Sequence, residues 1–91
     1  MKEKVKLIEG VFNSEEAQEL LHNLFESKIK FHELKNFQSK QRYGKEDTFA
    51  VNKIAMLKNN ASIIHELFQE AIQKNQKVKI DAVIKMQFSD K

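Results

Sequence analysis

The chain has 91 residues, a length typical of one small domain, and its 41% hydrophobic and 32% charged residues lie in the range of chains that fold. The absence of cysteine excludes disulfides, thiol nucleophiles, iron–sulfur clusters and cysteine-based zinc sites. The formal net charge of +3 permits a nucleic-acid partner without requiring one, because 13 acidic residues offset most of the 16 basic ones.

The start of the chain predicts a strand followed by a helix. Apolar residues alternate with lysines, which indicates a half-buried strand over residues 3–9. Asn13 is a typical helix N-cap, with Glu16 three positions later as in a capping box and Phe12 before it as a staple. Apolar residues at spacings of three and four then predict a helix over residues 14–26. This stripe consists of Ala17, Leu20, Leu21, Leu24 and Phe25.

The middle of the chain predicts a second strand and a loop. Apolar and polar residues alternate again over residues 28–34, which favours a strand. The alternative is a second short helix that uses Leu34 and Phe37. Residues 36–47 lack a clear period and contain the turn signal Tyr43-Gly44-Lys45, so we expect a connecting loop there, either without regular structure or with one helical turn.

The second half of the chain predicts a long helix and a final strand. Asp47 is placed to cap a helix over residues 48–75, in which apolar residues step by three and four. Asn59 and Asn60 are poor helix formers, but the stripe keeps its phase across them. We assign this stripe to core packing rather than to a coiled-coil seam. Residues 78–88 then alternate regularly, which predicts the last strand.

The predicted order is strand, helix, strand, helix, strand (β-α-β-α-β), which favours an α+β fold in two layers. A sheet of two or three strands is covered on one face by two helices, and we expect the two end strands to pair. No linker or repeat divides the chain, so we predict one domain over residues 1–91. No segment approaches the roughly 18 apolar residues of a membrane span, and the first ten residues lack an apolar signal core. We therefore expect a cytoplasmic protein without a membrane partner.

Five short segments carry a resemblance to other proteins. They are Leu7-Ile8-Glu9-Gly10-Val11-Phe12, Glu16-Ala17, Leu20-Leu21, Lys28-Ile29-Lys30-Phe31-His32 and Arg42-Tyr43-Gly44. With them the chain resembles short uncharacterised bacterial proteins known mainly from genome sequences and structural genomics. The resemblance covers nearly the whole chain and implies a bacterial protein, but it transfers no site residues because these segments have no established chemistry.

Residues that carry catalytic or metal chemistry form no recognisable motif. His22, His32 and His65 are predicted on three different elements without ligand spacing, so we interpret them as ordinary, partly exposed histidines rather than a zinc site. Acidic residues at the start of the first helix are favoured there by the helix dipole. With only Gly10 and Gly44, the chain has no glycine-rich phosphate loop. We therefore predict no enzyme, no cofactor and no metal.

Lysines define the candidate nucleic-acid surface. If the three strands form one sheet, its outward face is basic and attracts phosphate backbones. The segment 35–45 adds basic, amide and aromatic groups. The candidate residues are Lys4, Lys6, Lys28, Lys30, Lys35, Lys40, Arg42, Tyr43, Lys77, Lys79 and Lys85. Solvated lysines that protect sheet edges from aggregation explain the same pattern.

The leading hypothesis for function is a non-enzymatic interaction module that forms a homodimer. A domain of this size has a small core, and pairing with a second copy supplements it. Ile8, Leu34 and Val83, on an otherwise polar sheet face, form an apolar patch that suits such a contact. The alternative is a nucleic-acid-binding protein that uses the lysine face and the 35–45 loop. A hydrolase relying on His32 and a carboxylate is a third, weaker hypothesis.

Overall fold

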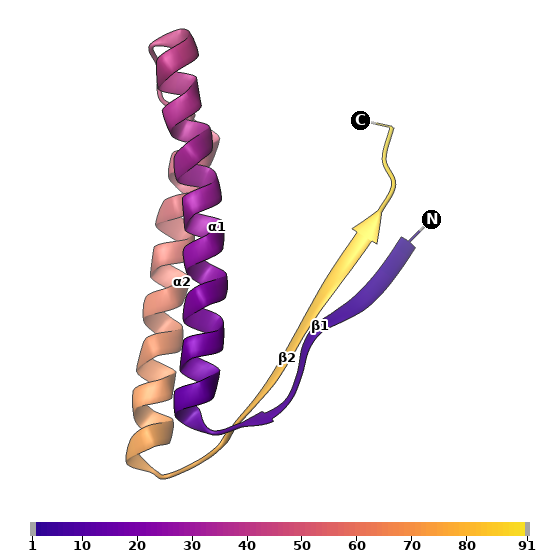
Figure 1. Cartoon of the computed structure of the whole chain (residues 1–91), viewed down its shortest axis with the longest axis vertical. Coiled ribbons are helices and arrows are strands. Elements are labelled where there is room, and N and C mark those ends of the chain that lie inside the picture. Colours follow the sequence, from indigo (N-terminus) through magenta and orange to yellow (C-terminus); the bar gives the residue numbers. More distant parts are fainter. Residues whose placement is uncertain (1, 91) are drawn as a thin grey trace.

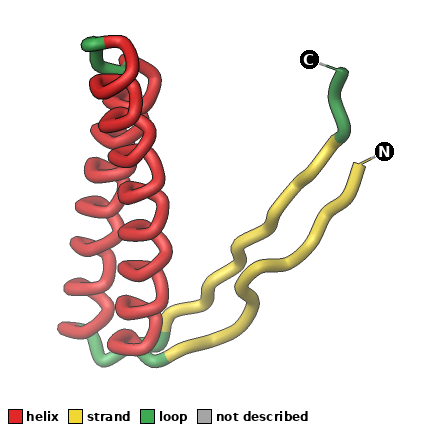
Figure 2. The backbone as a smooth tube through the Cα atoms, turned by 45° about the horizontal axis from the view of Figure 1, so that its top comes forward, coloured by secondary structure: helices red, strands yellow, loops and turns green. Residues whose placement is uncertain are grey.

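The computed structural model describes residues 2–90, which form a V with one helical and one β limb (Figure 1). In chain order the elements are β1 (Lys2–Phe12), α1 (Ser14–Tyr43), α2 (Thr48–Gln73) and β2 (Val78–Gln87). The two helices make an antiparallel hairpin, and the two strands make a ribbon that leaves the hairpin at its base (Figure 2). Within residues 2–90, no helix combines the length and the apolar composition needed to cross a bilayer.

The predicted α+β class is confirmed, but the predicted order is wrong because residues 28–34 do not form a strand. They are the middle of α1, which runs for 30 residues. The alternating pattern has another cause: Ile29 is buried, whereas Phe31, about 200° further around the helix, is 56% exposed. The alternative prediction of a helix in this segment is closer to the structure. However, Leu34 and Phe37 continue α1 and do not form a second short helix.

The helix boundaries follow the local capping chemistry. Asn13 caps α1 as predicted, since its side-chain oxygen accepts a hydrogen bond from the backbone N–H of Glu16 at 2.8 Å. Its amide also donates to the Glu16 carboxylate. Asp47 caps α2 in the same way and accepts from the N–H of Ala50 at 3.1 Å. Both predicted helix starts are thus confirmed at residues 14 and 48.

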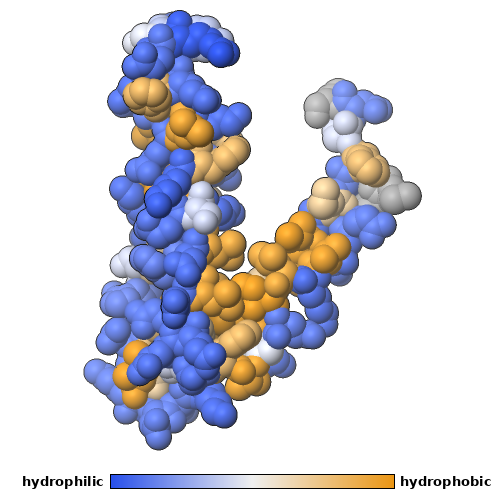
Figure 3. Space-filling view, viewed as in Figure 1, coloured by the Kyte–Doolittle hydropathy of each residue, from blue (hydrophilic) through white to orange (hydrophobic). Residues whose placement is uncertain are grey.

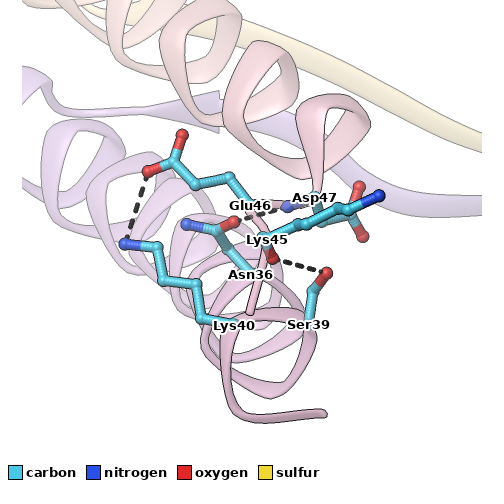
Figure 4. Close-up of polar contacts among 6 residues, drawn as sticks. All are labelled: Asn36, Ser39, Lys40, Lys45, Glu46 and Asp47. Atoms are coloured by element: carbon cyan, nitrogen blue, oxygen red, sulfur yellow. Dashed lines mark hydrogen bonds and ion pairs between the residues drawn. The ribbon is translucent and has the colours of Figure 1, made fainter. Parts of the chain in front are cut away.

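The turn between the helices is much shorter than the predicted loop over residues 36–47. Gly44 ends α1 with φ +67°, a left-handed conformation that glycine adopts without strain, and its N–H donates to the Lys40 carbonyl at 2.9 Å. The side chain of Asn36 accepts from the N–H of Asp47 at 2.8 Å (Figure 4). Ser39 donates to the Lys45 carbonyl at 2.9 Å. These bonds close the tip of the hairpin tightly.

The two end strands pair with each other, as expected, in an antiparallel ribbon. Opposite residues share a face, and one face is apolar except for Glu3, which lies opposite Met86 near the end of the ribbon. Its cross-strand pairs are Val5 with Ile84, Ile8 with Ala82, Gly10 with Ile80, and Phe12 with Val78. Leu7 is an additional residue between the paired Lys6 and Ile8, so β1 contains a bulge.

The core lies at the vertex of the V, where the apolar ribbon face meets the base of the hairpin. Ala17, Phe68 and Ile80 are buried there. Partly buried neighbours complete the cluster: Ile8, Phe12, Leu21, Ile64 and Val78. Ser14 ties the two ends of the hairpin together, because its hydroxyl donates to the Gln76 carbonyl at 2.8 Å. The helices therefore cover one sheet face, as predicted, but only its base.

Candidate interaction surface

Apolar side chains line the inner side of both limbs of the V (Figure 3). Among residues 2–90, the large apolar residues left exposed outnumber the buried ones, and no large side chain is fully buried. Single exposed apolar residues are common, whereas a continuous apolar surface is characteristic of a contact site. The elements that create this surface are two helix stripes and one half of the ribbon.

Helix α1 carries a second apolar stripe in addition to the one that packs on α2. Its members recur at spacings of four, seven and three: Leu20, Leu24, Phe31 and Leu34. Leu20 and Leu24 line a shallow cavity together with Leu7 and Ile8 of β1. The stripe therefore starts against the ribbon at the vertex and, by the helical repeat, continues along the inner side of the V.

Helix α2 carries a matching stripe. It consists of Phe49, Met56, Ile63 and Leu67, which are 46–65% exposed. Leu67 lines a cavity with Val78 and Ile80 of β2, so this stripe also begins at the ribbon. The buried Ala50 and Leu57 lie about 100° away around the helix and belong to the other stripe. Each helix therefore has one apolar face toward its neighbour and one without a partner.

The distal half of the ribbon forms the other limb of the V and also has an uncovered apolar face. Its apolar face continues from the buried Ile80 to Ile84 and Met86, which are 40% and 59% exposed, and Val5 opposite Ile84 is 53% exposed. No helix covers this half, because the ribbon diverges from the hairpin (Figure 1). We call these two helix stripes and the distal apolar ribbon face the inner surface of the V.

The size of the exposed surface is unusual for one chain. A compact monomer of 10.7 kDa exposes about 5,500 Å², whereas this chain exposes 7661 Å². The excess is about 2,150 Å² per chain. The radius of gyration is 16.5 Å, compared with about 12 Å for a compact domain of 91 residues. The molecule is also flat, with extents of 50 × 33 × 15 Å.

The structure separates the predicted nucleic-acid-binding residues. On the outer face of the ribbon lie Lys4, Lys6, Lys79 and Lys85, and Lys77 directly precedes β2. On α1 lie Lys28, Lys30, Lys35, Lys40, Arg42 and Tyr43. The single lysine face that three strands in one sheet would have formed does not exist, because residues 28–34, which carry Lys28 and Lys30, lie in α1. Acidic residues also interrupt both groups: Glu9 and Asp81 share the outer ribbon face, Lys6 pairs with Glu9, and Lys40 lies 3.3 Å from Glu46.

The predicted apolar patch is also separated. Ile8 lies on the inner ribbon face, Leu34 lies on α1, and only Val83 remains on the outer ribbon face, where it is 44% exposed. The inner surface was not predicted from the sequence, because Leu20 and Leu24 were assigned to the same stripe as Ala17. The repeat that continues from them to Phe31 and Leu34 was the signal that could have revealed it.

The polar side chains of residues 2–90 do not come together in a catalytic arrangement. The Gln18 amide nitrogen lies 3.1 Å from Nδ1 of His65, beside a cavity of about 90 Å³ that His22 also lines. His32 packs edge-on against the Phe31 ring at 5.2 Å. Across residues 2–90, no three potential metal ligands come together. A hydrogen bond from Lys74 and the charge of Lys74 lower the pKa of Glu70. The two side chains form an exposed ion pair at the C-terminal end of α2, where Lys74 is the cap residue.

Comparison with protein-family models, curated proteins and solved structures found no match to this chain.

Proposed function

We propose that this protein is a non-enzymatic interaction module that works as a homodimer. The observation that carries the proposal is the inner surface of the V, where both helices and the ribbon present apolar side chains without a partner in the same chain. Burying apolar surface is the main favourable term in association, so a chain with this surface gains stability from a partner that fills the V.

The exposed area fits a dimer of this chain. If each copy buries its excess of about 2,150 Å², the interface totals about 4,300 Å², within the range of about 2,000–5,000 Å² for obligate homodimers. A two-stranded ribbon is also only marginally stable without further strands or a covering helix. A second copy supplies both.

Charge placement is compatible with self-association. The lysines of the ribbon lie on its outer face, away from the apolar walls that the second copy would meet. Two copies carry a formal charge of +6, twice the +3 of one chain, and this charge stays exposed to solvent and screening ions. Apolar contact can therefore form without burying unpaired ammonium groups.

Sedimentation equilibrium tests the proposal directly. We expect a mass of about 21 kDa, twice the 10.7 kDa of one chain, at micromolar concentration, and a thermal midpoint that rises with protein concentration. A stable, folded 10.7 kDa species at 100 µM, with a midpoint independent of concentration, would overturn the proposal.

Nucleic-acid binding is the weaker alternative. It relies on the four lysines of the outer ribbon face, of which Lys4 and Lys85 lie opposite each other. Like charges on opposite residues destabilise a sheet, and a phosphate would relieve that repulsion. A fluorescence titration with single- and double-stranded DNA and RNA at low salt tests this alternative, which fails if none of them binds.

A further inference from the structure

We propose that the two copies associate through the free edge of β2, in an antiparallel register with the two-fold axis at Val83. This inference rests on the proposed homodimer and specifies its geometry. The result is a continuous four-stranded sheet in the order β1, β2, β2 of the second copy and β1 of the second copy. The occupant of the V is thus the ribbon of an identical chain.

The two edges of the ribbon are not equivalent. β1 contains the bulge at Leu7 and a left-handed glycine, Gly10, at φ +146°. Bulges and irregular glycines disrupt the row of hydrogen-bonding groups that another strand needs. β2 contains neither feature over Val78–Gln87. Of the two edges, only that of β2 is regular enough to accept a full-length strand.

The position of β2 directs this edge into the V. In both views of the backbone, the distal half of β2 lies on the side of the ribbon that faces the hairpin, and β1 lies on the far side (Figures 1 and 2). A strand added to β2 therefore enters the space between the two limbs. There it meets the unpartnered helix stripes.

The pleat of β2 restricts the register of self-pairing. Its inner-face residues have even numbers and, Val83 excepted, its outer-face residues are polar with odd numbers. Directly opposite residues in an antiparallel pair place their side chains on the same face. Apolar residues therefore stay together only when even numbers oppose even numbers, so the two-fold axis must pass through a residue and not between two residues.

Charges then select the residue. With the axis at Val83, Asp81 of each copy lies opposite Lys85 of the other, which gives two opposite-charge pairs. With the axis at Ala82, Lys79 lies opposite Lys85 of the second copy, which gives two like-charge pairs. An axis one residue beyond Val83 leaves Asp81 and Lys85 opposite uncharged residues and shortens the paired segment. Among the registers that pair most of β2, the one at Val83 is therefore the most complementary.

This register also covers the distal apolar residues. Ile80, which is 8% exposed beneath its own hairpin, lies opposite Met86 of the second copy, which is 59% exposed in the single chain. Ala82 likewise lies opposite Ile84 of the second copy. The uncovered distal half of each β2 thus lies beside the covered base of the other copy's β2, within reach of the partner hairpin. The inner surface that has no partner within one chain is completed by symmetry.

Disulfide trapping tests the axis, because the chain has no native cysteine. Directly opposite residues have Cα atoms about 4.5–5.5 Å apart, a separation that a disulfide spans. Under oxidised glutathione, Val83→Cys should form a covalent dimer in nearly all molecules. The matched control is Val11→Cys, on the same ribbon face and 64% exposed. Its two copies lie roughly 26 Å or more apart in the proposed dimer, so it should cross-link at least tenfold more slowly.

Mixed variants test the register. Asp81→Cys mixed with Lys85→Cys should form a disulfide between the two different chains, whereas each variant alone should not. Faster cross-linking of Ala82→Cys or Ile84→Cys than of Val83→Cys would overturn the register. Equal rates for Val83→Cys and Val11→Cys in a protein that sediments as a dimer would overturn the β2 interface and leave the homodimer standing. A monomer in sedimentation overturns both.

Discussion

Replacing Phe31 with serine tests whether the α1 stripe on the inner surface is buried by a partner. In the single chain, Phe31 is 56% exposed. Taking about 200 Å² for a phenylalanine side chain, about 110 Å² is left to bury, which corresponds to about 2.8 kcal/mol per copy. Two copies lose about 5.6 kcal/mol, and the dimer dissociation constant should rise by up to about 10,000-fold. Sedimentation equilibrium measures this change.

The chain offers a matched control in Phe37→Ser. Phe37 lies on the same helix and is 58% exposed, but it lies about 120° around the helix from Phe31, away from the inner surface. Its substitution should change the dissociation constant by less than about fivefold, because a surface site is worth within about 0.5 kcal/mol per copy and the dimer contains two copies. Equal effects of the two substitutions, or no effect of either, would refute a partner on this stripe.

Three further predictions concern the single chain. Phe68→Ala should destabilise the fold by about 3–5 kcal/mol in urea denaturation, because Phe68 is 4% exposed in the core, whereas Tyr43→Ala at the 67% exposed hairpin tip should change stability by less than about 0.5 kcal/mol. Gly44→Ala should cost about 1–2 kcal/mol through its φ of +67° alone, since an added Cβ would meet nothing within 4 Å; an unchanged thermal midpoint would contradict this. Because Lys74 lowers the pKa of Glu70 below 4.5, their pair stabilises the fold fully above pH 4.5 and loses its effect as the pH falls through the lower, folded value. The free energy of unfolding in urea should therefore be the same for Glu70→Gln and the unaltered protein only at acidic pH. A difference in this free energy that stays constant across pH would contradict a stabilising ion pair.

Local chemistry in the sequence was sufficient to predict much of the fold. Asn13 and Asp47 marked both helix starts because a cap depends only on a few neighbouring residues. Strict alternation over residues 78–88 predicted the last strand to within one residue. The pairing of the two end strands was also predicted correctly, although the third strand expected over residues 28–34 does not exist.

The middle of α1 was predicted wrongly because one pattern has two physical causes. Apolar residues two positions apart, such as Ile29 and Phe31, indicate a strand when one face is buried. They also arise in a helix that has apolar stripes on two faces. The absence of glycine and proline from residues 14–43 and the left-handed Gly44 after them favour the helix. Because the second apolar stripe of α1 was not recognised, the inner surface was not predicted either. A helix with two apolar stripes implies two packing partners.

The candidate surface could not be deduced from periodicity alone, because periodicity assigns a side chain to a face without saying what covers it. Ile80 and Ile84 occupy the same face of β2, yet one is 8% and the other 40% exposed. The difference arises from where the ribbon leaves the hairpin, a property of the tertiary structure. The lysines show the converse: their spacing was regular, but the elements that carry them lie on different limbs.

The bulge in β1 explains why the proposed sheet would end at four strands. In that dimer both outer edges belong to β1, and an edge without defects would recruit further copies and form fibres. Deleting Leu7 makes Lys6 and Ile8 consecutive opposite Val83 and Ala82, so β1 loses its bulge while its other residues, the left-handed Gly10 included, keep their faces. We expect this deletion to give concentration-dependent higher oligomers in sedimentation velocity. Leu7→Ala removes most of the same side chain, which is 50% exposed, but keeps the bulge and should remain a dimer. The Leu7 side chain is lost in both variants, whereas the additional residue is lost only in the deletion. If both variants stay dimeric, the bulge does not protect the edge of β1 from pairing with further copies.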